Sequence, residues 1–283
     1  DGRNEANQQA PNGAYSAELD VVYEHGNNPT ASVGPLFIDR SVPSADVRVS
    51  ERIFSPDGDG LQDEITVRQT DVSTEEAWTG TFTNAAGDTV RTLRWAGKAE
   101  TFVWDGTDEE GNRLPDGHYR YTLTSTDRAA NEGTFVVDRI TIDTRPTPVS
   151  LRIGSSAFSP NGDGIKDLLV LTPVLSVTDN IDNWLLEIRT ADDETVRSFR
   201  GMSRIPAAVE FDGDDDDGDR LPEGEYYGRI SVLYRNGSNP SASSAPFKVD
   251  VTKPSADVRV EPALFSPNGD GRKDTTTIIQ DGT

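Results

Sequence analysis

The sequence predicts an all-β protein made of tandem immunoglobulin-like antiparallel β-sandwiches. Two motifs recur at intervals of 104 to 107 residues, which is about the length of one such sandwich. Between the motifs lie short runs rich in β-branched and aromatic residues, separated by clusters of Gly, Asn, Asp and Pro. Helices are not expected, because the two most helix-like windows, residues 17–19 and 203–211, are too short or are interrupted by Pro206.

The first motif opens each repeat and the second lies near its end. The first reads FSPDGDGLQD from Phe54, FSPNGDGIKD from Phe158 and FSPNGDGRKD from Phe265. The second reads WDGTDEEGNRLPDGHY from Trp104 and FDGDDDDGDRLPEGEY from Phe211, and DGRNEANQQAPNGAY at the start of the chain matches its tail. The same structural unit is therefore expected in every repeat.

The sequence also has a longer period of 211 residues, which spans two of these repeats. Along that offset 30 of the 72 overlapping positions are identical, and PSADVRV occurs verbatim from Pro43 and from Pro254. Two kinds of unit therefore alternate, and we expect the chain to be a piece of a longer array. The expected units are the C-terminal part of one in residues 1–43, complete units in 44–146 and 147–254, and the N-terminal part of another in 255–283.

Seven short strands are expected in the unit of residues 44–146. In the clearest of them Tyr119, Tyr121 and Leu123 alternate with polar residues, which is the period of a strand with one solvated face. The others are identified by their β-branched and aromatic residues and by the turn residues between them. The expected strands cover residues 45–50, 64–70, 78–84, 89–95, 101–104, 118–126 and 134–141.

The formal net charge of −22 limits the choice of partner. Nucleic acids and anionic membrane surfaces both require a basic face, so neither is expected to bind this chain. No apolar run approaches the roughly 18 residues of a membrane span, so no membrane insertion is expected within this sequence. Cysteine is absent, which excludes disulfides and thiolate sites.

The loop of the first motif is the candidate metal site. Side-chain oxygens recur at matching positions, and glycines between them allow a tight turn, as calcium-binding loops require. The spacing is similar to the first half of an EF-hand loop but lacks its final bidentate Glu. A purely structural turn, in which these side chains bond backbone amides, is the alternative. The candidate calcium ligands are Asp57, Asp59, Asp63, Asn161, Asp163, Asp167, Asn268, Asp270 and Asp274.

The loop of the second motif is more acidic. Four carboxylates lie between Asp105 and Glu110, and six lie between Asp212 and Asp219. Such carboxylates repel one another and must be screened by solvent or an ion. Residues 1–9 keep the turn with few carboxylates, which favours a solvated β-hairpin tip over an obligatory metal site.

Catalysis finds little support in the sequence. His25 and His118 lie about one unit apart at different repeat positions, so no Ser-His-Asp grouping repeats. Acidic pairs are plentiful, but they lie on turns that recur in every unit. A glycan platform would use tryptophan, yet Trp104 is replaced by Phe211 at the matching position, which favours core packing. No catalytic residue or bound cofactor other than calcium is expected.

The two motifs together resemble the FlgD-type immunoglobulin-like domain. The domain takes its name from the flagellar hook-capping protein and also occurs in surface proteins and at the ends of secreted proteases. Residues 126–131, TDRAAN, are in addition similar to a hairpin of many bacterial Ig-like repeats, with Ala130 where Gly is usual. The resemblance implies the fold and a spacer or scaffold role. It implies little about chemistry, because the module is attached to many different proteins.

The sequence therefore predicts a non-catalytic tandem repeat region of a bacterial extracytoplasmic protein, whether cell-surface, secreted or periplasmic. Its expected role is a structural stalk, an adhesive or an assembly scaffold, in which calcium orders the first-motif loops if it binds. The expected partners are other Ig-like units of the same chain and a surface or extracellular protein or glycan. Two alternatives stay open, the accessory C-terminal region of a secreted hydrolase such as a protease, and a glycan-binding array.

Overall fold

The structure, a computed structural model, describes residues 2–252 and 256–282. The described residues form strands and turns and contain no helix, so none of them forms a helix that crosses a membrane. The chain divides into two compact units: Asp1–Thr147 with Asp179–Asp182 and Leu233–Asn239, and the remainder from Pro148 onward. The expected unit boundary at 254/255 lies outside the described residues, as does Asp1, the first residue of the second-motif copy.

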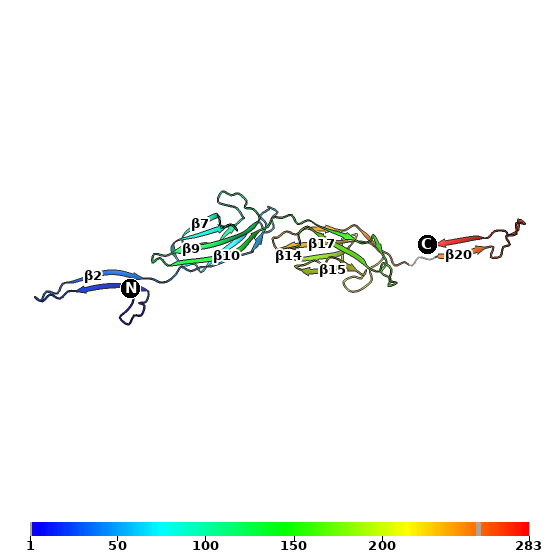
Figure 1. Ribbon diagram of the computed structural model, residues 1–283. Helices are drawn as coiled ribbons and strands as arrows, with labels where there is room; N and C mark the ends of the chain where they lie inside the picture. The colour runs from blue at the N-terminus through cyan, green and yellow to red at the C-terminus, as the bar shows by residue number, and fades with distance from the viewer. Residues whose placement is uncertain (1, 253–255, 283) are drawn as a thin grey trace. The chain divides into compact units, whose positions relative to one another are not determined.

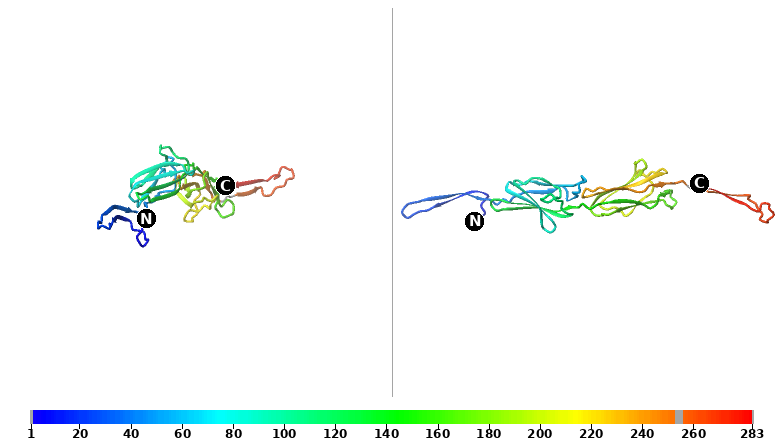
Figure 2. Two further views of the ribbon diagram at one scale, coloured as in Figure 1. Left: turned by 60° about the vertical axis from the view of Figure 1, so that its left-hand side comes forward. Right: turned by 90° about the horizontal axis from the view of Figure 1, so that it is seen from above.

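The first sandwich packs a three-stranded sheet against a five-stranded sheet, and both can be followed in Figure 1 and, from two other sides, in Figure 2. The sheet orders are β3-β5-β8 and β4-β10-β9-β6-β7. The strands are β3 (Asp46–Val49), β4 (Ile53–Phe54), β5 (Ile65–Thr70), β6 (Glu75–Thr83), β7 (Thr89–Gly97), β8 (Phe102–Trp104), β9 (Gly117–Thr126) and β10 (Glu132–Ile142). All seven expected strands are present, within a few residues at each end.

The additional strand, β4, was not expected from the sequence. It lies inside the first motif and pairs parallel to β10, through Ile53 with Thr141 and Phe54 with Ile142. The other strand pairs of this sandwich are antiparallel. The sandwich is therefore antiparallel except at this short pairing, which places Phe54 at the edge of the five-stranded sheet.

Aromatic rings fill the space between the two sheets of the first sandwich. Trp104 from β8 stacks on Phe82 from β6, with ring centroids 3.9 Å apart. Tyr119, Tyr121 and Leu123 of β9 are all buried, which confirms the predicted alternation. Because adjacent strand residues face opposite sides, their polar neighbours are directed outward.

The second sandwich has the same plan. Its sheets are β11-β13-β16 and β12-β19-β17-β14-β15, with β18 paired to β17, and β12 again pairs parallel to β19. Its core includes Leu171, Leu186 and Ile230, all fully buried. The strands are β11 (Val149–Ile153), β12 (Ala157–Phe158), β13 (Leu169–Leu175), β14 (Ile181–Thr190), β15 (Thr195–Met202), β16 (Val209–Phe211), β17 (Gly224–Tyr234), β18 (Ser241–Ser243) and β19 (Phe247–Val249).

Two further hairpins complete the described chain, β1 (Gly13–Asp20) with β2 (Thr30–Ile38) and β20 (Ala256–Glu261) with β21 (Thr277–Gly282). Their register repeats that of the sandwiches at the 211-residue offset. Tyr15 pairs with Leu36 as Tyr226 pairs with Phe247. The pairings of β20 with β21 likewise match those of β3 with β5. The repeat seen in sequence is therefore also a repeat of strand pairing.

The hairpins expose side chains whose counterparts in the sandwiches are buried. Leu19 is 62% exposed, whereas the matching Ile230 is 0% exposed. Ile278 is 61% exposed, whereas the matching Val67 is 0% exposed. The apolar face of each hairpin is thus the face that a complete sandwich covers.

Replacing Gly201 by Ala should destabilise the second sandwich by about 1–3 kcal/mol, as overpacking does. Gly201 lies opposite Trp184 in the β14–β15 pairing, and an added Cβ would approach the indole Nε1 to 2.8 Å. The ring has little freedom to move, because it is buried and its Nε1 donates a 3.0 Å hydrogen bond to the Arg204 carbonyl.

Urea unfolding followed by tryptophan fluorescence measures this effect. Gly154→Ala in the same sandwich is the control, because its added Cβ meets nothing closer than 3.6 Å and should change stability by less than about 0.5 kcal/mol. Equal stabilities for the two variants would contradict the packing argument.

Candidate functional site

The last acidic residue of the first motif binds the backbone of its own loop. In the first copy, the two carboxylate oxygens of Asp63 accept hydrogen bonds from the N–H groups of Gly58, at 2.6 Å, and Gly60, at 2.8 Å. Asp167 binds Gly162 and Gly164 in the same way, each at 2.7 Å. In the third copy Asp274 accepts from Gly269 at 2.9 Å and Gly271 at 2.7 Å. This carboxylate therefore closes the turn in all three copies.

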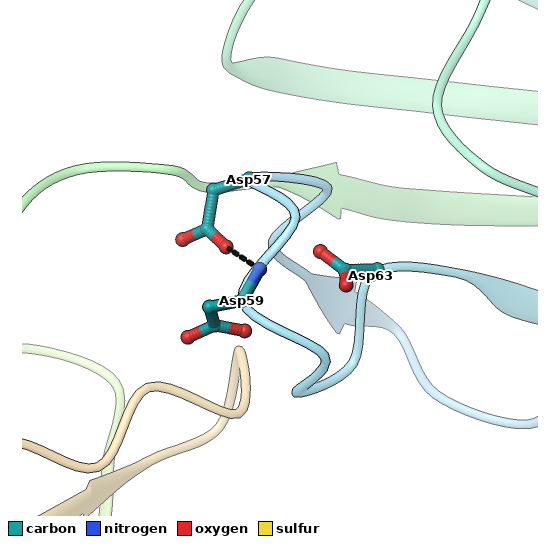
Figure 3. Close-up of side chains that lie close together, drawn as sticks. All are labelled: Asp57, Asp59 and Asp63. Atoms are coloured by element: carbon teal, nitrogen blue, oxygen red, sulfur yellow. Dashed lines mark hydrogen bonds between the residues drawn. The ribbon is translucent and has the colours of Figure 1, made fainter.

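The other two oxygen-bearing residues form successive Asx turns. Asp57 Oδ1 accepts from the N–H of Asp59 at 3.1 Å, and Asp59 Oδ1 accepts from the N–H of Leu61 at 2.7 Å. Figure 3 shows the first of these bonds and the loop turning back so that Asp63 lies across from the other two carboxylates. The same pair of bonds recurs in the later copies, made by Asn161, Asp163, Asn268 and Asp270.

The glycines of this loop are required by its backbone. Gly58 and Gly60 have φ angles of +88° and +86°, in the region that residues with a Cβ avoid. Their N–H groups are thereby turned toward the carboxylate of Asp63. The order of Asp and Gly in the motif thus follows from the hydrogen bonds of the turn, as the structural alternative predicts.

The first copy of the loop also brings three carboxylates together. One oxygen from each of Asp57, Asp59 and Asp63 lies within 4.8 Å of the others. These are hard oxygen ligands of the kind that calcium prefers, so the residues fit a cation in their chemistry. In the two later copies, Asn161 and Asn268 supply a neutral amide oxygen instead of the first carboxylate, so the first loop is the most favourable of the three.

Hydrogen bonding alters the acidity of one of these groups. The N–H groups of Gly162 and Gly164 lower the pKa of the Asp167 carboxyl below its ordinary value of 3.8. Hydrogen bonds to the charged form of an acid have this effect.

The second motif meets the first inside the sandwich. The rings of Phe54 and Trp104 lie 5.5 Å apart. In the second sandwich the Phe158 and Phe211 rings lie 5.7 Å apart. Beside this contact Gly106 has a φ of +72°, and a Cβ there would lie 3.0 Å from the Pro56 ring. The two motifs therefore recur together because each repeat needs both for one packing contact.

The tyrosine that ends the second motif anchors its turn. The Tyr119 hydroxyl donates to the carbonyl of Pro115 at 2.7 Å, and the Tyr226 hydroxyl donates to Pro222 at 2.9 Å. Tyr15 donates to Pro11 at 2.8 Å in the first copy. The motif did not by itself predict this role, although the constant four-residue spacing of Pro and Tyr is a signal for it.

The acidic loops of the second motif are hairpin tips, as expected. A backbone bridge between Thr107 and Arg113 closes the first of them. Within it, Asp108 Oδ1 accepts from the N–H groups of Glu110 and Asn112 at 2.9 and 2.8 Å. The same two bonds are made in the second sandwich by Asp215, and Asn4 makes one of them in the first copy. An amide oxygen is therefore sufficient at this position.

The two histidines lie on different elements, and the tryptophans lie in or against the cores. His25 lies in the loop between β1 and β2, whereas His118 lies on β9 and contacts Thr141. Trp78 and Trp104 are fully buried and Trp184 is 7% exposed, which confirms core packing for these three, whereas Trp95 is half-buried against the core of the first sandwich.

Comparison with known proteins agrees with this architecture. Residues 59–129 match the family model of the FlgD Ig-like domain, which confirms the resemblance over that stretch. No curated protein matches the chain.

Several solved structures are similar to the chain at low identity. They include a tetra-tandem repeat from the extending region of a large adhesion protein, with 18% identity, a TM-score of 0.34 and coverage of 89% of this chain and 60% of that one. A 1.5-MDa bacterial ice-binding adhesin has 13% identity, a TM-score of 0.35 and coverage of 83% and 73%. The fibronectin(III)-like modules of Clostridium thermocellum CbhA have 12% identity, a TM-score of 0.36 and coverage of 74% and 95%.

Acid should open the loop of the second copy at a pH below the ordinary aspartate value. Since the folded pKa of Asp167 lies below its unfolded value, its charged form stabilises the folded loop above the unfolded pKa. That contribution is lost as the pH falls through the folded pKa. The amide proton resonances of Gly162 and Gly164 are therefore expected to shift together, below pH 3.8, in an NMR titration.

The Asp167→Asn variant should lack this titration step while the rest of its spectrum is preserved. Amide shifts centred above pH 3.8 would contradict the assignment.

Proposed function

We propose that this chain is a non-catalytic tandem repeat region of a bacterial extracytoplasmic protein, and that it acts as a stalk, adhesive region or scaffold. The observation that carries the proposal is that the motif residues of every copy serve the fold. Asp63 and its counterparts close one turn, and Tyr119 and its counterparts close another. The residues that define the repeat are thereby accounted for by the fold.

The hydrogen bonds of the segment that follows each sandwich favour the role of a stalk. After the first sandwich, both the N–H and the hydroxyl of Thr144 donate to the carboxylate of Asp116, at 3.0 and 2.8 Å. After the second, Glu223 accepts from the N–H of Val251 at 3.0 Å and from the hydroxyl of Thr252 at 2.7 Å. Each connecting segment is thus fixed to its own sandwich, and nearby prolines restrict it further.

The same proposal assigns both ends of the chain to incomplete Ig-like units. Residues 1–43 and 255–283 would each be part of an Ig-like unit, as their register and their exposed apolar faces support. The occupant of each face would be further Ig-like strands of the kind found in residues 147–211 and 73–146. Residues 44–146 and 147–254 would be the complete units.

Single-molecule stretching of the chain tests the proposal. Two unfolding events are expected, each releasing roughly 35 nm of chain, because about 105 residues extend by about 3.5 Å each. The hairpins should give no unfolding event of their own, since a two-stranded hairpin is only marginally stable. Events of other lengths would contradict the unit boundaries. Hydrolysis of a peptide or glycan panel that is lost on changing one carboxylate would contradict the non-catalytic role.

We also propose that calcium orders the first-motif loops, because Asp57, Asp59 and Asp63 fit a hard cation. Calcium should then raise the melting temperature of the chain more than magnesium does. Changing Asp59, Asp163 and Asp270 together to Asn should abolish the calcium effect. The ion-free stability should be nearly unchanged, because an Asn Oδ1 can still accept the amide bond that each Asp makes.

Calorimetry with and without each ion gives the measurement. A variant carrying Glu110→Gln, Asp217→Asn and Asp219→Asn removes the same charge from the acidic loops and should keep the calcium effect. Equal responses of the unmodified chain to the two ions would leave the loops as turns only.

A further inference from the structure

In each sandwich, the acidic loop of the second motif lies against an edge strand of the larger sheet. Strand β7 ends the five-stranded sheet of the first sandwich, and β15 ends the corresponding sheet of the second. Edge strands direct unpaired N–H and C=O groups outward, where a strand of another molecule can add to the sheet. The first three residues of the two edges, Thr-Val-Arg, are identical, so every copy of the chain brings the same kind of edge.

A carboxylate from the second-motif loop occupies this edge in both sandwiches. Glu109 Oε1 accepts a 2.9 Å hydrogen bond from the N–H of Thr92 in β7. Asp216 Oδ1 accepts a 3.1 Å hydrogen bond from the N–H of Ser198 in β15, and the N–H of Asp216 donates to the Val196 carbonyl at 3.0 Å. The two acids hold matching places in the motif. In the second sandwich, Asp216 therefore hydrogen-bonds two successive outward backbone groups of the edge strand, the Val196 carbonyl and the Ser198 N–H.

An arginine of each edge strand fixes the loop in this position. Arg91 Nη1 donates to the carbonyl and hydroxyl oxygens of Thr107, at 3.2 and 2.9 Å. Arg197, at the matching place in β15, donates to the carbonyl of Asp215. In both units an arginine and a backbone N–H of the edge strand donate to the loop, and in the second unit the N–H of Asp216 also donates back to the strand.

The acid at this position is retained where its neighbours are not. Glu5 stands at the matching place in the first copy of the motif, beside Ala6. The next position is acidic only in the later copies, as Glu110 and Asp217. The preceding position accepts Asn4, because there an amide oxygen can bond the backbone. Apart from the Asp that opens the motif, this is the position of the loop that is acidic in all three copies, and it is where the loop reaches the edge strand.

We propose that Glu109 and Asp216 seal these sheet edges against strand pairing with a second copy of the chain. A strand that added to β7 or β15 would break a charge-assisted hydrogen bond and would bury a carboxylate without a partner. In a tandem array, like edges are held at high effective concentration, which makes such pairing a hazard. The proposal concerns association and is independent of the proposed stalk function.

Removing both acids should open the edges. In the Glu109→Ala/Asp216→Ala chain, amide hydrogen exchange at Thr92 and Ser198 should accelerate about tenfold at low protein concentration, as expected on losing such a bond. At high concentration the same amides should become protected again as copies pair. Sedimentation should show an increase in association relative to the unmodified chain over the same range.

The Glu110→Ala/Asp217→Ala chain is the matched control. It loses the same charge from the same loops, and no hydrogen bond joins either side chain to β7 or β15 in the described part of the chain. It should exchange and sediment like the unmodified chain. Equal association of both variants would show that lost charge alone is responsible and would overturn the proposal, as would unchanged exchange at Thr92 and Ser198 in the first variant.

Discussion

Each sandwich depends on the contact between the ring that opens its repeat and the ring near its end. Phe54 on Trp104, and Phe158 on Phe211, join parts of the chain that lie about 50 residues apart. Around this contact the first-motif proline packs on the second-motif glycine, so both loops begin from a fixed point. The hydrogen bonds within the loops are local and form also in the third copy, where Phe265 is 46% exposed, so the buried contact fixes where each loop lies in the sandwich and not its internal bonds.

The hydrogen bonds of the loops explain much of the acidic composition. Many of the carboxylates accept hydrogen bonds from backbone amides that would otherwise be unpaired in tight turns. Because such bonds act over short range, they are less sensitive to salt than attraction between distant charges. The charge of −22 therefore describes how the turns are built more than what the protein attracts.

Much of the fold could be predicted from sequence, because alternation and repetition are local or periodic signals. Tyr119, Tyr121 and Leu123 show their buried face in the order of residues alone. Strand β4 could not be found in this way, since it is two residues long and depends on a parallel partner distant in sequence. The edge contact of Glu109 with Thr92 was equally hidden, because it requires the loop to fold back over 17 residues. At the first-motif loop the sequence left turn and calcium open, and the structure shows the turn bonds in full.

The matched register of the hairpins bears on how such a chain folds. β20 and β21 pair as β3 and β5 do although the strands that would cover them are absent from the described chain. Pairing is thus specified within a short stretch, before distant strands are brought together. Repeats two units apart, which share 30 of 72 residues, could otherwise exchange strands during synthesis. A chain that sets each hairpin first commits its strands to their own unit, and long arrays of similar units can then fold one after another without becoming entangled.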